Sequence, residues 1–217
     1  MSKVRGVFDE AAHGYDDWYG APKGRQVYQL ELEAVARYLP PSGVGVEFGA
    51  GTGVFAEGLT NRLRVVLCVD ISTSMLRNAL KRGLPSILAS AKEPPFREGT
   101  LGFGYMITVL EFLEEPSETL RNCSEVIRNG APFVLITINR ESPWGEMYEE
   151  SGRRGSLIFS NARLYSFGEV TSMIDEADLE LVEAFGTLTK GPEDPDTGSS
   201  RVEAGPGPGI LIFLIRD

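Results

Sequence analysis

Three closely spaced glycines in the first quarter of the chain have the pattern of a ligand-binding turn. Gly49, Gly51 and Gly53 alternate with small residues, directly after an apolar run that ends in the acidic Glu47. Glycine lacks Cβ, so it can adopt a positive φ and let a ligand lie against bare backbone. The first amides of a following helix would face that ligand, with the positive end of the helix dipole behind them. A strand–helix turn without a ligand is the alternative, although three glycines within five residues exceed what one turn requires.

Asp70 is the second residue whose position indicates chemistry. It follows an apolar, β-branched run over residues 63–69. A carboxylate at the end of a strand, about 20 residues beyond a glycine turn, can accept hydrogen bonds from a ribose diol. The alternative role is N-cap of the next helix, which Ser72 or Thr73 could fill equally well. We therefore expect Asp70 to bind a ribose.

The segments on either side of these residues alternate between strand and helix patterns. After the strand that precedes the glycines, strand patterns occupy residues 63–69, 86–89, 101–109, 132–138, 181–188 and 210–215, and helical patterns occupy 24–39, 74–84, 118–128 (capped by Ser117) and 167–177. This alternation predicts an α/β fold with a doubly wound, Rossmann-like sheet of about seven strands, mostly parallel. The last strand should be antiparallel, because the loop 190–209 contains no helix and suffices for a hairpin.

In such a sheet, ligands bind beyond the carboxyl ends of the strands, where the winding reverses. The glycines, Asp70, Ser90–Ala91 and Thr108 should all lie at that edge. Two segments fall outside the alternation. Residues 5–20 are rich in aromatic side chains and predict a short helix that either caps the core or forms a lid over the glycine loop. Residues 139–168 are polar and aromatic, and we expect them to be irregular.

Composition narrows the class of protein. The 217 residues carry a formal charge of -10, which argues against a surface that follows the phosphates of a nucleic acid. No apolar run approaches the roughly 20 residues of a membrane span, and the N-terminus lacks the apolar core of a signal peptide, so we expect a cytoplasmic protein. Cys68 and Cys123 should be buried free thiols, and no metal site is expected.

The segment from Glu47 to Gly53, EFGAGTG, resembles the first motif of class I S-adenosylmethionine-dependent methyltransferases. Three further segments resemble the type 11 subgroup, which methylates mainly small molecules: Val69–Ser72 with Met75, Leu76 and Ala79, then Pro94–Phe96, and the upstream pair Tyr15–Asp16. The likeness covers residues 8–128 most closely. It implies a single methyltransferase domain over residues 1–217, with residues 1–22 as an N-terminal lid and 139–168 as an insertion at the acceptor site.

The resemblance also implies the residues that bind S-adenosylmethionine, whose product is S-adenosylhomocysteine. The methionyl part would be framed by Glu47, Gly49, Ala50, Gly51, Thr52 and Gly53, and Asp70 would hold the ribose. Ile71 and Met75 would flank the adenine, whose amino group would meet either the Ser90 hydroxyl or only the backbone of Ala91. Thr108 and Val109 would contact the methionyl group through their backbone, and Tyr15 would close over the sulfonium. The sequence departs from the family pattern at Ser90 and Gly104, where aspartate is common. We interpret the change at Gly104 as structural.

Direct in-line displacement on a small-molecule acceptor requires a base only if the acceptor must lose a proton. His13 and Glu111 are weak candidates; an exposed histidine without a role and a solvated helix-start carboxylate are the alternatives. Trp18, Asn139, Arg140 and Trp144 would line the acceptor pocket, and acidic residues beside aromatic ones would suit a cationic amine. The protein could be a monomer or a homodimer.

Two other functions fit parts of the sequence. Residues 51–56 also match the G-x-G-x-x-A pattern of nicotinamide-dependent oxidoreductases, and Asp70 would suit the NAD ribose. Against this reading, a whole helix precedes the first strand and no second domain supplies a catalytic acid. A cofactor-binding module that has lost catalysis is the other alternative, indicated only by Ser90 and Gly104.

Overall fold

The structure is a computed structural model and describes residues 3–217. Its helices are α1 (Lys3–Ala11), α2 (Asp17–Gly20), α3 (Pro22–Ala36), α4 (Val54–Leu59), α5 (Thr73–Lys81), α6 (Pro116–Glu125), α7 (Pro143–Arg153) and α8 (Phe167–Glu176), with the 3₁₀ turns η1 (Leu110–Phe112) and η2 (Phe159–Asn161). Its strands are β1 (Gly43–Phe48), β2 (Arg64–Asp70), β3 (Ser86–Leu88), β4 (Gly104–Ile107), β5 (Phe133–Ile138), β6 (Glu180–Thr187) and β7 (Ile210–Arg216). Met1 and Ser2, part of the predicted lid, lie outside the described residues.

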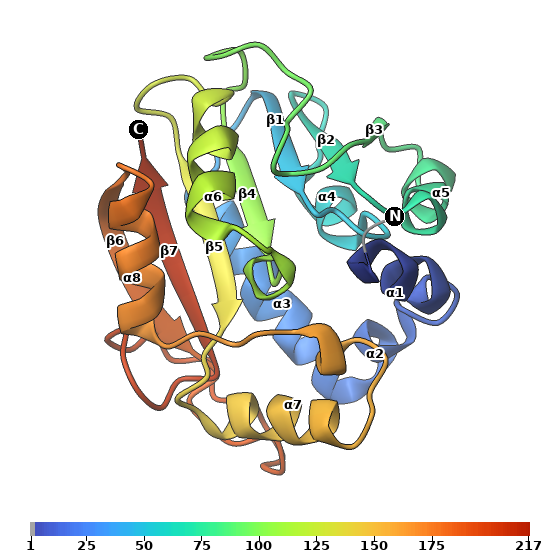
Figure 1. The fold of residues 1–217 in the computed structure, drawn as a ribbon, viewed down its shortest axis with the longest axis vertical. Coiled ribbons are helices and arrows are strands. Elements are labelled where there is room, and N and C mark those ends of the chain that lie inside the picture. Colours follow the sequence, from blue (N-terminus) through green and yellow to red (C-terminus); the bar gives the residue numbers. More distant parts are fainter. Residues whose placement is uncertain (1–2) are drawn as a thin grey trace.

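The strands form one seven-stranded sheet in the order β3-β2-β1-β4-β5-β7-β6 (Figure 1). Strands β1 to β5 pair in parallel, and β7 pairs antiparallel with both β5 and β6. The predicted fold class, including the antiparallel last strand, is therefore confirmed. The winding reverses between β1 and β4, so the loops that follow these two strands flank the switch point of the sheet.

Register brings the predicted ligand-binding residues to one edge. Phe48 of β1 is paired with Val69 of β2, so Gly49 and Asp70 follow at the same level of the sheet. Ile107 of β4 is paired with Ile136 of β5, which places Thr108 at the same edge. Neighbouring strands of a sheet lie about 4.8 Å apart, so residues that follow adjacent strands can contact the same ligand.

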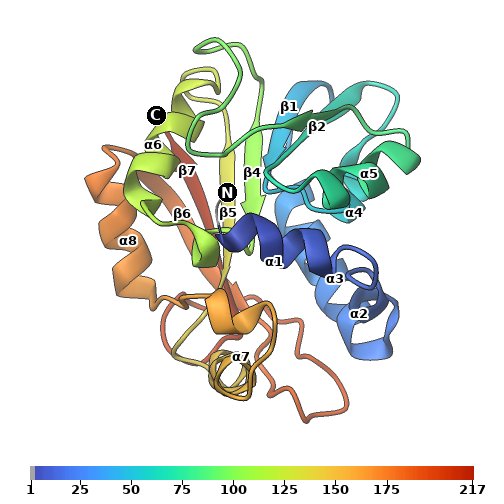
Figure 2. The ribbon, with the colours of Figure 1, turned by 45° about the vertical axis from the view of Figure 1, so that its right-hand side comes forward.

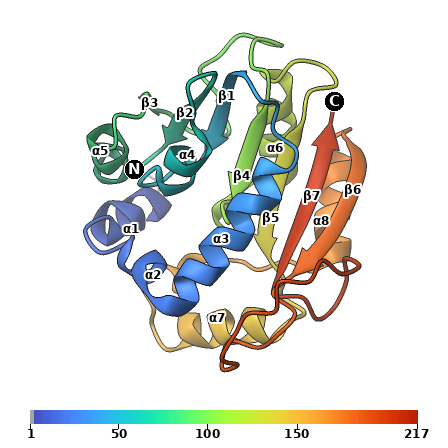
Figure 3. The ribbon, with the colours of Figure 1, turned by 180° about the vertical axis from the view of Figure 1, so that it is seen from behind.

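Helices cover both faces of the sheet with separate apolar cores. Helices α3, α4 and α5 lie on one face, as the view from behind shows (Figure 3). Their side chains, among them Val35, Phe55 and Leu76, are buried against the strands. Helices α6 and α8 lie on the other face (Figure 1), where Leu120 and Ile174 are buried. Both cysteines are buried free thiols, as predicted.

Three local predictions were wrong. Strand β4 is shorter than residues 101–109, because Leu101 pairs instead with Ile127 in an isolated bridge. Helix α6 begins earlier, with Pro116 in its first turn, and the Ser117 hydroxyl bonds Glu176 at 2.7 Å instead of capping the helix. Residues 139–168 are not irregular throughout.

That last segment contains α7, which begins with a proline at a position where the missing N–H costs nothing. The Ser142 hydroxyl caps α7 by accepting a hydrogen bond from the Gly145 amide at 3.0 Å. In the ribbon, α7 lies below the ends of β5 and β7, across from α1 and α2 (Figure 1). The segment therefore lies at the edge of the sheet where β5 ends.

The N-terminal helix α1 crosses the same edge in front of the sheet (Figure 2). It is fastened to the start of α5 by Asp9, whose Oδ1 accepts hydrogen bonds from the Ser72 hydroxyl at 2.7 Å and from the Ser74 amide at 3.0 Å. Within residues 3–217, no helix combines the length and the apolar character needed to cross a membrane.

Candidate active site

A cavity of about 480 Å³ opens at the carboxyl ends of β1, β2 and β4. It contains most of the residues predicted to bind a cofactor. These are Tyr15, Gly49, Gly51, Asp70, Ile71, Met75, Ser90, Ala91, Thr108 and Val109. Residues from widely separated parts of the sequence thus meet in one place, which we call the first cavity.

The glycine loop needs its glycines for two different reasons. Gly49 and Gly51 have φ angles of 69° and 53°. A Cβ on Gly49 would lie 2.4 Å from a methyl of Val109, so packing excludes a side chain there. A Cβ on Gly51 would have only the Met75 sulfur nearby, at 4.0 Å. Gly51 therefore presents bare backbone to the first cavity, as a close-lying ligand requires.

Asp70 holds this loop and also faces the first cavity. Its Oδ2 accepts a hydrogen bond from the Gly51 amide at 2.8 Å, and its Oδ1 accepts one from the Ser72 amide at 2.7 Å. Burial raises the pKa of the Asp70 carboxyl, while these two amide bonds oppose the rise. The N-cap of α5 is Ser72, whose hydroxyl accepts from the Met75 amide. Each carboxylate oxygen keeps a further lone pair for a ligand hydroxyl.

Four residues of the first motif do not line the first cavity: Glu47, Ala50, Thr52 and Gly53. The Glu47 carboxylate is buried below the loop, where it accepts a hydrogen bond from the Tyr105 hydroxyl at 3.1 Å. Burial raises the pKa of Glu47 to about 8. Gly53 begins α4 at a φ of 77°. These residues support the loop from behind.

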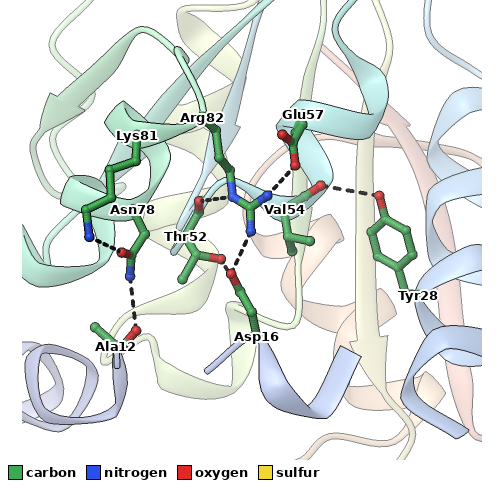
Figure 4. Close-up of polar contacts among 9 residues, drawn as sticks. All are labelled: Ala12, Asp16, Tyr28, Thr52, Val54, Glu57, Asn78, Lys81 and Arg82. Atoms are coloured by element: carbon green, nitrogen blue, oxygen red, sulfur yellow. Dashed lines mark hydrogen bonds and ion pairs between the residues drawn. The ribbon is translucent and has the colours of Figure 1, made fainter. Parts of the chain in front are cut away.

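Thr52 belongs to a contact that sequence reasoning missed. Its hydroxyl donates to Asp16 Oδ1 at 2.6 Å, and Arg82 donates both to Asp16 Oδ2 at 2.6 Å and to the Thr52 carbonyl at 3.1 Å (Figure 4). The Asn78 side chain also donates to the Ala12 carbonyl at 3.0 Å. We call Asp16, Thr52 and Arg82 the latch, because they join the N-terminal segment to the glycine loop.

The two departures from the family pattern have different surroundings. A Cβ on Gly104 would lie 2.4 Å from the Cδ1 of Ile127, so an aspartate has no room at this position. Ser90 lines the first cavity, and its hydroxyl accepts a hydrogen bond from the Lys92 amide at 3.1 Å.

A second cavity of about 440 Å³ lies between the N-terminal helices, α3 and α7. Tyr15, Thr108 and Phe112 line both cavities, so the two spaces meet at these side chains. Thr108 has a φ of 49°, in the left-handed region that non-glycine residues rarely adopt. Such strain is typical of functional sites.

The residues predicted for the acceptor pocket divide into two pairs. Trp18 and Trp144 line the second cavity. Asn139 and Arg140 line neither cavity. The Asn139 amide donates to the carbonyls of Gly205 and Pro208, and Arg140 forms an ion pair with Glu169 at 2.9 Å. Asn139 therefore holds the loop before β7, and Arg140 contacts the first turn of α8.

Neither proposed base lines the first or the second cavity. His13 is exposed at the surface. Glu111 is buried, contrary to the solvated carboxylate that was its alternative reading. Its Oε1 accepts hydrogen bonds from the Thr137 hydroxyl and the Ile138 amide, both at 2.8 Å, and burial raises its pKa.

Glu31 is the acidic residue that sequence reasoning missed. It lies on α3, is only 3% exposed, and lines the second cavity. Burial, with a smaller contribution from the Glu111 carboxylate, raises the pKa of Glu31 to about 8. The available signal was its spacing, since Glu31 follows Val27 by four residues and precedes Ala34 by three on the apolar stripe of the helix.

Comparisons with known proteins agree with this arrangement. The family described as "Methyltransferase domain" matches residues 46–135. An uncharacterized protein of Methanocaldococcus jannaschii is 34% identical over 96% of this chain and 97% of its own length. A ubiquinone biosynthesis O-methyltransferase of Paracidovorax citrulli is 25% identical over 62% of this chain and 61% of its own length.

A similar solved structure comes from Thermotoga maritima. It is described as a SAM-dependent methyltransferase, "possible histamine N-methyltransferase", and aligns with a TM-score of 0.85 and 26% identity over 98% of this chain and 99% of that one. Together with the glycine loop, the aspartate after β2 and the seven-stranded sheet, these matches place the chain in the class I S-adenosylmethionine-dependent methyltransferases, type 11 subgroup.

Proposed function

We propose that this protein transfers the methyl group of S-adenosylmethionine to a small-molecule acceptor by direct in-line displacement. One observation carries the proposal: the cavity that contains the family's cofactor motifs meets a second, aromatic cavity at Tyr15, Thr108 and Phe112. A cofactor in the first cavity and an acceptor in the second would then be separated only by these side chains.

The residues of the first cavity fit the proposed cofactor. Bare backbone at Gly51 leaves room for its chain, the Asp70 carboxylate can accept from ribose hydroxyls, and the apolar side chains of Ile71 and Met75 can flank an adenine. When bound, S-adenosylmethionine supplies a methyl group on a positively charged sulfur, which is already a strong electrophile.

The protein's own side chains must bind the acceptor and orient it toward the methyl group. The aromatic walls exclude water from the second cavity and orient the acceptor, and positioning of this kind supplies a large part of the rate. We also propose that residues 1–22 act as a lid, with the latch holding α1 and α2 over the junction of the cavities. The size of the second cavity favours a compact acceptor, within the range usual for small-molecule sites.

Calorimetry decides between this function and the alternatives. We expect S-adenosylhomocysteine to bind and NADH not to bind. Transfer of labelled methyl groups from S-adenosylmethionine to small amines, phenols or thiols should then separate an enzyme from a module that only binds the cofactor. Binding of NADH in preference to S-adenosylhomocysteine would overturn the proposal.

A further inference from the structure

The second cavity has one carboxyl group in a wall that is otherwise mainly aromatic and aliphatic. Among the described residues that line it, Glu31 is the only one with an ionisable acid or base other than tyrosine. Within residues 3–217, neither a hydrogen bond nor an ion pair reaches its carboxylate. A buried carboxylate without a partner is costly, so proteins normally provide one or leave the place to a ligand.

The other titratable side chains that line the second cavity with Glu31 are Tyr15, Tyr19 and Tyr148, and none of them supplies a positive charge. The buried Glu111 carboxyl contributes to the raised pKa of Glu31. A second carboxyl group nearby makes a cation still more favourable at this point. An anionic acceptor would be repelled there.

The aromatic side chains around Glu31 are arranged to enclose a small body. Tyr148 and Phe159 stack with ring centroids 4.3 Å apart, and Trp18 and Tyr19 meet edge to face at 5.0 Å. The Trp144 indole N–H donates to the Lys190 carbonyl, so its polar atom already has a partner. What these residues offer a ligand is therefore mainly ring surface, which attracts cations and packs against apolar groups.

We propose that the acceptor is a primary or secondary amine on a compact aromatic or apolar body, and that the Glu31 carboxylate binds its nitrogen and accepts its proton. This rests on the methyltransferase function proposed above. It assigns the chemical class of the acceptor and a role to Glu31.

The proton and electron balance of this step is simple. An alkylamine reaches the cavity as an ammonium ion, and Glu31 releases its own proton to solvent to form the ion pair. Transfer of one proton from nitrogen to the carboxylate then frees the lone pair, which forms the new N–C bond. The electron pair of the broken S–C bond stays on sulfur, and the product is a methylated ammonium ion beside a neutral thioether.

The test uses two probes of matched shape, 2-phenylethylamine and 2-phenylethanol, with the protein saturated with S-adenosylhomocysteine. Calorimetry near neutral pH should show the amine binding at least about tenfold more tightly than the alcohol. Glu31→Gln, which keeps the shape of the side chain, should abolish that preference. Amine binding measured in buffers of different ionisation enthalpy should release about one proton in the wild type and none in Glu31→Gln.

Glu33→Gln is the matched control, because Glu33 lies on the same helix with its side chain exposed. It should keep the wild-type preference. The proposal would be overturned if the amine failed to bind or if both probes bound equally well to the wild type. It would also be overturned if Glu31→Gln kept the preference for the amine, or if Glu33→Gln lost it. The affinity for S-adenosylhomocysteine should be unchanged in Glu31→Gln. This measurement tests the proposed cofactor site separately from the chemical class of the acceptor.

Discussion

The Asp70 carboxylate and the Gly51 amide are joined by a hydrogen bond of 2.8 Å across the mouth of the first cavity. The bond links the end of β2 to the glycine loop that follows β1. One aspartate therefore shapes the loop and faces the proposed ribose site. Removing its carboxylate can therefore weaken ligand binding in two ways, through the shape of the loop and through the contact with the ribose.

Asp70→Ala should weaken binding of S-adenosylhomocysteine by about 1–3 kcal/mol, because ribose hydroxyls lose a buried acceptor. Adenosine and 2′,3′-dideoxyadenosine distinguish the two effects in calorimetry. If Asp70 holds the ribose, the substitution weakens the binding of adenosine much more than the binding of the dideoxy compound. An equal loss for both nucleosides would restrict Asp70 to supporting the loop.

Gly51→Ala should close part of the first cavity, because its new methyl group enters space that is empty in the wild type. Both Gly51 and Gly83 have positive φ, 53° and 75°, and alanine is strained at either position by about 1–2 kcal/mol. Gly83→Ala is therefore a control matched for strain, with nothing within 4 Å of the added Cβ.

Both glycine variants should unfold at lower urea concentration than the wild type. Only Gly51→Ala should lose affinity for S-adenosylhomocysteine, by about tenfold or more in calorimetry. If the two variants bound the ligand equally well, the glycine loop would not lie against the cofactor.

The latch should control how tightly the N-terminal helices are held. Asp16→Ala removes the acceptor of the buried Thr52 hydroxyl and of Arg82. The side chains of Asp16 and Arg82 are partly exposed, so we expect the loss of their ion pair to cost roughly 0.2–1 kcal/mol. Hydrogen exchange of residues 3–20 should become about twofold to fivefold faster. Asp17→Ala, on an exposed neighbour, is the control. Identical exchange in the two variants would show that the latch does not restrain the lid.

Stability should fall as pH rises, because Glu31 and Glu47 each have a pKa raised from 4.5 to about 8 by burial. Between these values the folded protein holds more protons than the unfolded chain, so the free energy of unfolding decreases with pH and levels off above about pH 8. Each group contributes at most about 1.4 kcal/mol per pH unit.

Glu47→Gln should therefore reduce the loss of stability between about pH 5 and pH 8, as followed by urea unfolding. Glu33→Gln, on the exposed side of α3, should leave the slope unchanged. A slope in Glu47→Gln equal to that of the wild type would mean that Glu47 ionises normally in the folded protein.

The first cavity could be predicted from the sequence because its signals are local. Glycine spacing and a carboxylate after an apolar strand each fix a residue's place at the sheet edge, and parallel pairing of β1 with β2 brings Gly49 and Asp70 together.

The second cavity was harder to predict because the residues that line it belong to no local sequence motif. Asn139 and Arg140 follow β5 directly, yet contacts with Gly205 and Glu169 turn them away from the ligand-binding edge. Helix α7 was missed even though Ser142 and Pro143 are a start signal. The burial of Glu31 could have been predicted from its position, because an acidic residue on the apolar stripe of a helix faces the protein interior.

A crystal structure of the complex with S-adenosylhomocysteine is the decisive measurement of how the cofactor and acceptor sites meet. We expect the ribose hydroxyls on Asp70, the adenine beside Ile71 and Met75, and the sulfur at Tyr15 and Thr108, directed toward the second cavity. A ligand bound elsewhere, or a sulfur directed away from the junction of the two cavities, would contradict it.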